Sequence, residues 1–479
     1  MTLALLVIIP TLIGFVTLYV RNVRFDLALL LAAAAAHLVV TALLWAGLPG
    51  RQLSFFLQLD VTGLLFLSIT SVLFFVTSLY TISYVLDGTH DEQASPQRFI
   101  PCLLWFLAAM TLVTVTHHLA LMWAAVEATT LASAPLVYFY KRKGALEAAW
   151  KYLLICSVGI ALALLGVFFL GIAASAAPQG SNALTLAELI GAAPLMSRNW
   201  LKAAFVLALV GFGTKMGLAP LHTWLPDTHS QAPSPVSALL SGALLNCALL
   251  AILRFYQICL ASGDAEFART LLLAFGMISI GVACAFMVRQ ADYKRLFAYS
   301  SIENMGIIAV GFGLGGAAVY GAVLHALNHS LCKAGLFFLA GNVLREFGST
   351  KAREVQGVLN RLPASGALMM ALLFAIGGAP PFGPFVSELM IFRSAISTHA
   401  PWISIMFLFL LAVAFLGMAG VLLPMLQSTP ARGSERRAEA ALAVIAPLIM
   451  TAGALFLGVY IPSALSDVIR QAAATLGGG

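Results

Sequence analysis

Charge is scarce in this sequence. Only 9% of its 479 residues are Asp, Glu, Lys or Arg, whereas 61% are hydrophobic. So little polar surface cannot cover a water-soluble globule of this length, which excludes a soluble protein. The apolar residues come instead in blocks of about 20, the length that crosses a hydrocarbon core of about 30 Å. The composition therefore predicts an integral membrane protein.

Paired cysteines are also missing. The six cysteines stand singly in apolar runs, without the short spacings of zinc or iron–sulfur ligands. They are Cys102, Cys156, Cys247, Cys259, Cys284 and Cys332. We expect them to be small buried residues, so that no cofactor or metal is held by this chain. A glycine-rich phosphate loop and a nucleophile elbow are absent from the sequence as well, and we expect no covalent catalysis by this chain.

The apolar runs predict an all-α fold of about fourteen transmembrane helices, because they lack the period-two alternation of a membrane barrel. The first run has no basic residue before it, so we interpret it as a span and not as a signal peptide. The predicted spans are 2–20, 26–47, 61–86, 99–116, 119–140, 148–175, 200–219, 233–260, 268–288, 296–315, 317–344, 364–397, 402–427 and 438–462.

Basic residues gather in the loops after the odd-numbered spans, and the positive-inside rule then places both termini on the non-cytoplasmic side of a bacterial or archaeal cytoplasmic membrane. The net charge of +7 thus reports topology and not a nucleic-acid partner. The loops after odd spans hold Arg21, Arg24, Lys141, Arg142, Lys143, Arg289, Lys294, Arg295, Arg345, Lys351, Arg353, Arg361, Arg432, Arg436 and Arg437. The loops after even spans hold Arg51, Arg198 and Arg269.

Two clusters of glycine and proline interrupt the apolar runs. One begins at Gly217 and reaches Pro235, and the other covers residues 377–384. Such clusters at membrane depth predict discontinuous helices in spans 7 and 12. A five-helix unit used twice, as spans 4–8 and 9–13, would bring the two breaks to equivalent positions, the pattern of inverted-repeat transporters. The corresponding divisions of the chain are 1–98, 99–260, 261–427 and 428–479.

The first half carries a glutamate and a lysine inside the membrane. A charged side chain at the bilayer centre costs about 2.5–3.5 kcal/mol on insertion scales, so each one requires an explanation. Glu127 lies in the middle of span 5, and Lys215 lies five residues before Pro220. A buried lysine binds its proton less strongly unless a carboxylate is near. We therefore interpret the pair as a proton switch, with a purely structural ion pair as the alternative.

Span 11 places three titratable residues on one helical face. His325, His329 and Lys333 are four residues apart, which brings them into one stripe. A lone buried histidine is usually just hydrogen-bonded, but three such groups together favour a proton relay. Zinc binding by the two histidines is the weaker alternative, because no third ligand accompanies them.

The second half has a further proton-translocating candidate in Glu388, and other polar residues are candidates for accessory roles. Glu388, just beyond the second break, is the expected terminal carboxylate, with Arg393 as its partner if it is only structural. Glu303 stands near the start of span 10, where its role is ambiguous. His222, Asp227 and His229 follow the first break, and they either cap freed backbone groups or lead protons toward Lys215. The last two residues, His117 and His118, lie between spans 4 and 5, where we expect a solvated loop.

A long motif carries a family resemblance. The run GTKMGLAPLHTWLPDTHSQAPSPVSALLSG resembles the proton-channel stretch of antiporter-like subunits in respiratory complex I, in Mrp-type cation/proton antiporters and in group 4 [NiFe]-hydrogenases such as formate hydrogenlyase. AWKYLLICSVG, AYSS, HALNHSLCKAGLFFLAG and FGPFVSELMIF agree further, over about residues 60–430. Glu303-Asn304 and PPFGPFVSE are most similar to the hydrogenase branch, in its hydrogenase-4 component F group.

The resemblance implies a hydrophilic axis across the membrane, formed here by Glu127, Lys215, Lys333 and Glu388. Asn246 stands where many complex I relatives have a central lysine, so the link between the halves would run through water, His325 or His329. The implied function is proton translocation, coupled to [NiFe] and iron–sulfur centres in a peripheral redox arm. The alternatives are a complex I subunit, an Mrp-type Na⁺/H⁺ antiporter subunit and a transport-inactive scaffold.

Overall fold

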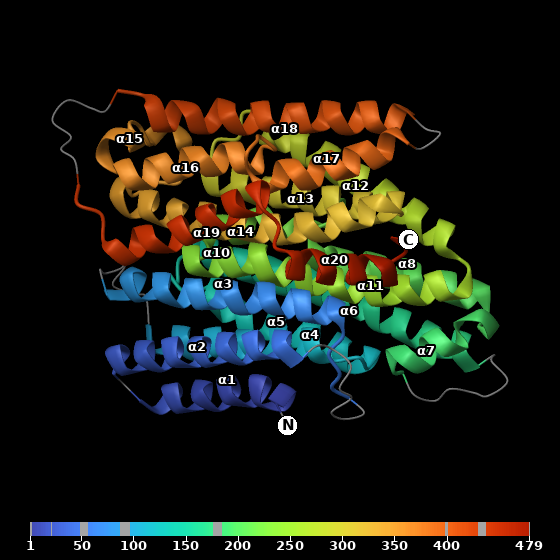
Figure 1. Ribbon diagram of the computed structural model, residues 1–479. Helices are drawn as coiled ribbons and strands as arrows, with labels where there is room; N and C mark the ends of the chain where they lie inside the picture. The colour runs from blue at the N-terminus through green and yellow to red at the C-terminus, as the bar shows by residue number, and fades with distance from the viewer. Residues whose placement is uncertain are drawn as a thin grey trace.

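The computed structural model describes residues 2–20, 22–47, 56–86, 96–175, 184–397, 401–429 and 437–478, and it shows a bundle of helices whose axes run in one general direction (Figure 1). Four loop cations used for the topology prediction, Arg21, Arg51, Arg432 and Arg436, lie outside the described residues. Among the described residues, β-structure is limited to isolated bridges such as Asp292 with Lys351. The all-α class is therefore confirmed.

The α-helices are α1 Thr2–Tyr19, α2 Val23–Gly47, α3 Val61–Leu86, α4 Pro96–Val115, α5 Leu119–Val137, α6 Lys143–Ser175, α7 Leu186–Ala192, α8 Arg198–Met216, α9 Trp224–Gln231, α10 Ser234–Leu239, α11 Leu245–Ser262, α12 Ala265–Met287, α13 Tyr293–Leu314, α14 Ala317–Phe347, α15 Val358–Arg361, α16 Pro363–Ile376, α17 Gly383–Ile396, α18 Pro401–Gln427, α19 Ala441–Val459 and α20 Ser463–Thr475. A π-helical turn, η2 Leu240–Leu244, joins α10 to α11, and two 3-10 turns are η1 Ala193–Leu195 and η3 Ala352–Glu354.

Every predicted span coincides with a helix or with a pair of helix segments. Within the described residues, ten helices are long and apolar enough to cross a membrane, and Leu3–Tyr19 and Pro363–Ile376 are shorter apolar helices. The remaining predicted spans fall on α8, α13 and α17, which carry charged residues in their sequences. The predicted multi-pass architecture is confirmed, and the count of fourteen crossings stays a prediction.

Both predicted helix breaks are present. α8 ends at Gly217, whose φ of 84° is in the left-handed region that glycine adopts readily, and α9 starts only at Trp224. In the second half, α16 ends at Ile376 and α17 begins at Gly383. Each break thus leaves backbone groups inside the bundle without an intrahelical partner. The inverted relation between spans 4–8 and 9–13 stays a prediction.

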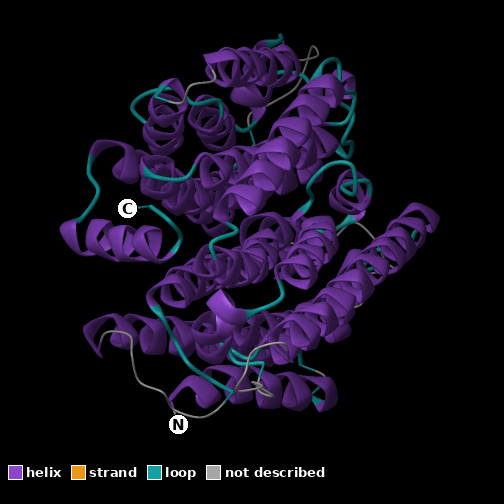
Figure 2. Cartoon of the chain, turned by 90° about the vertical axis from the view of Figure 1, so that its right-hand side faces the viewer, coloured by secondary structure: helices purple, strands orange, loops and turns teal. Residues whose placement is uncertain are grey.

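The centre of the bundle is the continuous segment Ser234–Ser262. Its most apolar window is entirely buried inside the protein, whereas the corresponding window of α18 is only 28% buried. In Figure 1, α18 forms the upper edge of the bundle and α1 the lower edge, while α10 and α11 lie between them. Figure 2 shows the same bundle turned by 90°, with helices throughout and loops at their ends.

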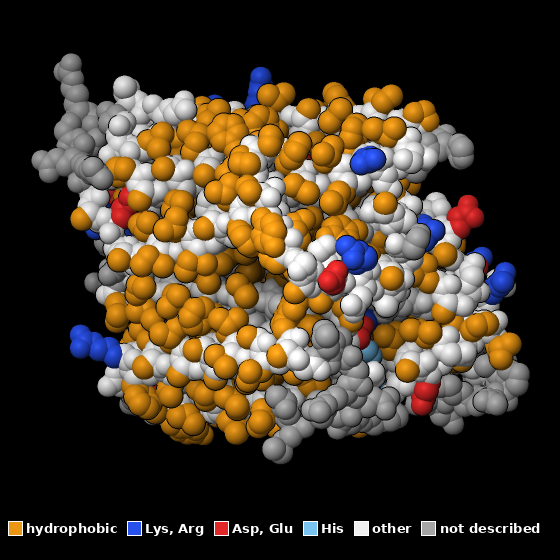
Figure 3. Space-filling model, in the orientation of Figure 1, with side chains coloured by type: hydrophobic (Ala, Val, Ile, Leu, Met, Phe, Trp, Pro, Cys, Tyr) orange, Lys and Arg blue, Asp and Glu red, His pale blue; other side chains and the backbone are white. Residues whose placement is uncertain are grey.

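The outer surface is apolar. Hydrophobic side chains cover most of the face drawn in Figure 3, where charged side chains are few. Large side chains on α18 point outward, including Ile405 and Leu416, which are 71% and 68% exposed. Exposed apolar surface of this extent is tolerated in contact with lipid and not with water.

Four short helices were not predicted, namely α7, α9, α15 and α20. α7 lies in the loop between α6 and α8, and α20 follows α19 at the end of the chain. α20 buries Val468, Ile469, Ala472 and Ala473 against the bundle, where it contacts α3 and α14. At 13 residues, α20 is too short for the 20-residue hydropathy criterion that identified the spans.

Candidate functional site

Lys215 lies in the last turn of α8, immediately before the first break, and its side chain is fully buried. Its ammonium nitrogen, Nζ, donates hydrogen bonds to the hydroxyls of Thr130 on α5 and Tyr152 on α6, both at 2.7 Å. Nζ also lies 4.5 Å from the centre of the Tyr152 ring. Burying an ammonium group is tolerated only when acceptors replace its water, and the two hydroxyls do so here.

Glu127 is half-buried on α5 and is bound by two hydroxyls. Ser157 on α6 donates to Oε1 at 2.8 Å, and Thr130 donates to Oε2 at 3.3 Å. The Thr130 hydroxyl therefore accepts from Lys215 and donates to Glu127. Among the described residues the lysine and the glutamate form no direct ion pair, so the predicted pair is bridged by a group that can pass a proton.

The centre of the bundle holds Asn246, on α11 just after the π-helical turn. Its amide nitrogen donates to the Gly242 carbonyl at 2.9 Å and to the Ser330 hydroxyl on α14 at 2.7 Å. Its amide oxygen is buried without a partner among the described residues. A buried polar atom of this kind is normally satisfied by water. Asn246 therefore joins α11 to α14 and leaves one acceptor for a water molecule.

His325 connects three helices of the second half. Its ring lies between the Ser387 hydroxyl on α17, 2.9 Å from Nδ1, and the amide oxygen of Asn304 on α13, 3.1 Å from Nε2. The serine hydroxyl can donate or accept, and the amide oxygen accepts. Both the neutral ring with hydrogen on Nε2 and the protonated ring therefore have partners in this arrangement.

His329 and Lys333 follow one and two turns later on α14, and both are fully buried. Nζ of Lys333 donates to the Phe297 carbonyl at 3.1 Å. Nε2 of His329 lies 3.3 Å from the Ser241 carbonyl, and its Nδ1 has no partner among the described residues. The described part of the chain has no group of three or more His, Cys, Asp or Glu that could hold a metal ion.

Glu303 is more central than its sequence position suggested. It lies in the middle of α13 and is 4% exposed, so the expectation that it stands near a loop is wrong. That expectation placed the start of span 10 too late, whereas α13 already begins at Tyr293. The charge of Glu303 acts on both Lys333 and Glu388. Glu303 is therefore a buried carboxylic acid in the interior of the second half.

Glu388 is buried in the second turn of α17, beside the second break. Its carboxylate lies against Gly378, where a Cβ atom would collide with Oε2, and Gly378 has a φ of 69°. Arg393, the expected structural partner, is exposed at the end of α17. Within the described residues no ion pair joins Arg393 to Glu388. A structural ion pair between these two residues therefore does not explain why Glu388 is buried.

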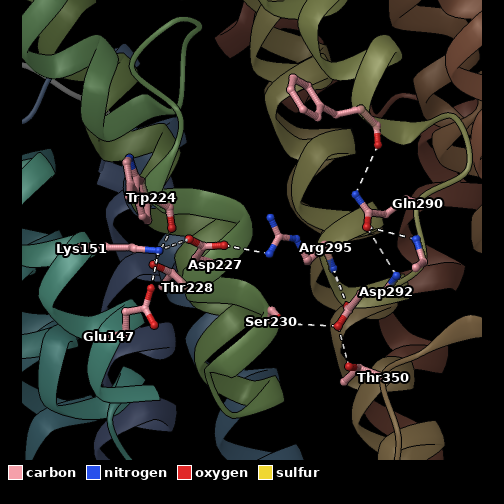
Figure 4. Close-up of polar contacts among 12 residues, drawn as sticks. Glu147, Lys151, Trp224, Asp227, Thr228, Ser230, Gln290, Asp292, Arg295 and Thr350 are labelled. Carbon is pink, nitrogen blue, oxygen red and sulfur yellow. Dashed lines mark hydrogen bonds and ion pairs between the residues drawn. The ribbon is translucent and has the colours of Figure 1, made fainter. Parts of the chain in front are cut away.

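Asp227 in α9 joins the two halves of the bundle (Figure 4). One carboxylate oxygen lies 3.1 Å from Nζ of Lys151 on α6, and the other lies 2.9 Å from a guanidinium nitrogen of Arg295 on α13. Asp292, which precedes α13, accepts from Ser230 of the same short helix at 3.3 Å. These contacts fix α9 between the halves, which favours a structural role for Asp227.

His229, also in α9, faces the second half of the bundle and not Lys215. Its ring stacks on Phe337 of α14 with centroids 4.7 Å apart, and the charges of Lys294 and Lys333 act on it. Both ring nitrogens are buried without partners among the described residues. His222, earlier in the break, packs edge-on against Tyr299 of α13, 6.4 Å between ring centres.

Sequence reasoning missed the hydroxyls that bind Lys215 and Glu127, and it placed Lys294 in a loop. Tyr152 and Ser157 lie within AWKYLLICSVG, a segment that drew attention only as part of a motif. Lys294 lies in the first turn of α13, is 1% exposed and donates to the Ala232 carbonyl at 2.6 Å. It had been assigned to the loop because it stands next to Arg295, which is only partly buried.

Comparison with known proteins identifies the family. Residues 116–415 match the family described as NADH:quinone oxidoreductase/Mrp antiporter, transmembrane. The chain belongs to this family. A hydrogenase-4 component F homolog from Methylacidiphilum infernorum is 39% identical over 349 residues, which cover 71% of this chain and 73% of that protein.

Solved structures of similar fold belong to large membrane complexes. A chain of an archaeal membrane-bound sulfane sulfur reductase matches with a TM-score of 0.88 and 22% identity, covering 99% of this chain and 97% of that one. A chain of Thermus thermophilus respiratory complex I matches with a TM-score of 0.77 and 25% identity, covering 96% and 97%. The resemblance inferred from the motifs is thereby confirmed, and the protein is a multi-pass, antiporter-like membrane subunit.

Proposed function

We propose that this protein translocates protons across a cytoplasmic membrane as a subunit of a redox-driven complex of the group 4 [NiFe]-hydrogenase type. The observation that carries the proposal is the buried Lys215, whose proton can reach Glu127 through one threonine hydroxyl. An ammonium group that only locked two helices would be better served by a direct carboxylate partner. Here the intervening hydroxyl accepts on one side and donates on the other.

The proposed proton path continues along the bundle toward the second half. Water at the free oxygen of Asn246 and at Nδ1 of His329 would bridge the centre, because buried polar atoms without protein partners are normally hydrated. Beyond the centre, the Lys333 amine and the Glu303 carboxyl interact electrostatically, and Glu303 also acts on Glu388. A proton could therefore pass among these three groups. A change of charge at one end then alters how strongly the next group holds its proton.

The similarity to a hydrogenase-4 component F homolog supports the hydrogenase branch of the family. In that branch, [NiFe] and iron–sulfur centres would belong to partner subunits of a peripheral arm, and this chain would contribute the ion path. The positive-inside rule supports both termini on the non-cytoplasmic side. The divisions 99–260 and 261–427 would be the two inverted units, each with one broken helix, between the terminal divisions 1–98 and 428–479.

The test is proton flux in proteoliposomes that contain the complete complex, in Na⁺-free buffer, with redox turnover followed at the same time. Lys215→Ala and Glu127→Gln should each lower the flux per turnover by at least about 10²-fold, the usual size of a lost proton-transfer group. Lys151→Ala, which removes an exposed lysine at the surface end of α6, should leave the flux per turnover unchanged.

Full flux in the Lys215→Ala complex would contradict the proposal. The chain would then be interpreted as a transport-inactive membrane scaffold. Flux that requires added Na⁺ would instead support the Mrp-type Na⁺/H⁺ antiporter. A [NiFe] large subunit that co-purifies with the chain would identify the hydrogenase branch, whereas a quinone-reducing NADH module would identify complex I.

A further inference from the structure

An ionic cluster around a buried arginine lies toward the end of the bundle where α11 ends, away from the residues discussed above. Arg254 on α11 is 1% exposed, and its guanidinium binds both carboxylate oxygens of Asp60, at 2.6 and 2.7 Å. Asp60 immediately precedes α3 and also accepts from the Gly63 amide at 2.8 Å. This two-point geometry is the strongest form of arginine–carboxylate pairing.

His117 completes the cluster, although its sequence position between α4 and α5 predicted a solvated loop. That prediction is wrong, because the residue is buried, with 7% exposure. Its main chain is fixed on both sides, since its carbonyl accepts from Leu186 at 2.8 Å and its amide donates to the Phe56 carbonyl at 3.4 Å. Its Nε2 lies 3.4 Å from a guanidinium nitrogen of Arg254 and 3.4 Å from Oδ1 of Asp60.

The two partners of Nε2 require opposite states of that nitrogen, one without and one with a hydrogen. A guanidinium can only donate, so it pairs with Nε2 when that nitrogen carries no hydrogen. An ionised carboxylate can only accept, so it pairs with Nε2 when that nitrogen carries one. Burial alone would raise the pKa of the Asp60 carboxyl, but the Arg254 guanidinium, followed by His117, holds that pKa below its usual value. Asp60 therefore stays ionised and available as an acceptor.

A cavity of about 580 Å³ opens onto this cluster. Its polar lining consists of Asp60, His117, Gln58 and Gln257, together with Thr475 near the end of α20, and α7 adds apolar residues. Among the lining residues that the structure describes, His117 and Asp60 alone are titratable. A water molecule occupies about 30 Å³ in the liquid, so the cavity has room for a chain of water molecules that ends at the imidazole.

We propose that His117 exchanges protons with water at one mouth of the translocation path, and that Arg254 and Asp60 hold its neutral and protonated states in turn. A proton from the cavity adds to the imidazole, and the ring then pairs with Asp60 in place of Arg254. Loss of that proton reverses the exchange, and no other bond forms or breaks. The inference rests on the proposed function, because it supplies one end of the path.

The connection to the interior is α11 itself. Arg254 and Asn246 stand on this helix eight residues apart, which corresponds to about 12 Å at 1.5 Å per residue. The Arg254 pair therefore stands on the same buried helix as the central asparagine. The mouth lies on the side of the loops after even spans, which is the non-cytoplasmic side if the positive-inside rule holds.

The test compares variants of the complete complex in proteoliposomes by proton flux per redox turnover. His117→Gln keeps a hydrogen-bonding side chain but cannot carry a charge, and it should lower the flux by roughly 10²-fold. His118→Gln is the matched control, because the neighbouring imidazole caps α5 and does not line the cavity, and it should keep the flux. Lys215→Ala reports on the proposed function in the same assay.

The outcomes separate the two proposals. Loss of flux in both Lys215→Ala and His117→Gln supports the inference. Loss in Lys215→Ala with wild-type flux in His117→Gln overturns it and leaves the proposed function intact. Wild-type flux in Lys215→Ala would contradict both the proposed function and the inference about His117.

A second measurement does not depend on transport or on the assembly of the His117 variant. Gln257→Cys places a thiol in the wall of the cavity, and a membrane-impermeant maleimide should label it from one side of the membrane only. Cys247 and Cys259, buried on the same helix, are built-in controls that should stay unlabelled. Labelling of Gln257→Cys no faster than these two cysteines would show that water does not enter the cavity, and it would overturn the inference.

Discussion

Two of the buried lysines, Lys215 and Lys333, are bound in different ways. Lys215 stands at a helix break and donates to the hydroxyls of Thr130 and Tyr152, whereas Lys333 stands in the unbroken α14 and donates to a main-chain carbonyl. A hydroxyl can pass a proton onward, but a carbonyl can only accept a hydrogen bond. The first lysine thus has a protein route to its carboxylate, and the second depends on charge and water.

The carboxylates of the two halves, Glu127 and Glu388, also have different surroundings. Glu127 is half-buried and receives two hydroxyl donors. Glu388 lies against the glycine of a break and shares its surroundings with a second carboxylate, Glu303. The first half is therefore a hydroxyl-linked pair, and the second half is a charge cluster flanked by histidines.

The largest effect should come from the glycine of the second break. Gly378→Ala places a Cβ atom into the Glu388 carboxylate at a φ of 69°, so we expect the loss of nearly all proton flux and a destabilisation of about 1–2 kcal/mol from the backbone alone. Flux assays and thermal melting of the complex measure both.

Gly217→Ala is the matched variant in the first break. It also has a positive φ, 84°, but its Cβ would meet only the end of the Leu225 side chain, at 2.7 Å. We expect a comparable loss of stability with flux largely kept. Equal losses of flux in the two variants would remove the distinction between the breaks.

A smaller effect should follow from removing the bridging hydroxyl of the first half. Thr130→Val keeps the side-chain shape but leaves Lys215 with one acceptor and Glu127 with one donor. We expect flux to fall about tenfold and stability to fall by about 1–3 kcal/mol, the penalty for an unsatisfied buried group.

Thr129→Val provides the control for that change. Thr129 is buried on the same helix, but its hydroxyl donates only to the Val126 carbonyl. Flux in this variant should stay within about twofold of wild type, because a neutral hydrogen bond is worth only about 1 kcal/mol. If Thr129→Val and Thr130→Val behaved alike, the hydroxyl bridge would have no special role.

The smallest effect should come from the ionic contacts of α9. Asp227→Asn removes two partly exposed ion pairs, with Lys151 and Arg295, and should lower the stability of the complex by about 1 kcal/mol. The difference should shrink in high salt, which screens such pairs. Melting curves at low and high ionic strength measure it, and a salt-independent loss would show that Asp227 acts otherwise.

The spans, the breaks and the buried charges could be predicted because each has a strong local signal in the sequence. Hydropathy located the helices, glycine and proline located the breaks, and charge inside an apolar run marked Glu127, Lys215, Lys333 and Glu388. These signals are local in sequence and large in energy. They remain readable without knowing how the helices pack.

The connecting residues could not be predicted, for a physical reason. Thr130 and Tyr152 are ordinary in a membrane helix, because a hydroxyl can usually bond to its own helix backbone, and their role appears only when α5, α6 and α8 meet. His117 and Lys294 stand next to the partly buried polar residues His118 and Arg295, and their own burial depends on contacts from distant segments. Glu303 was misjudged because the start of its helix was placed too late.

We propose that Lys215 and Lys333 serve one continuous proton path. Proton flux per turnover in Lys215→Ala, Lys333→Ala and the double variant tests it most directly. Groups in series act as a unit, so we predict that each single variant loses at least about 10²-fold and that the double variant loses no more than either one. Single variants that each lose about half of the flux, with a loss in the double variant that is their sum, would mean two independent paths and would contradict the account.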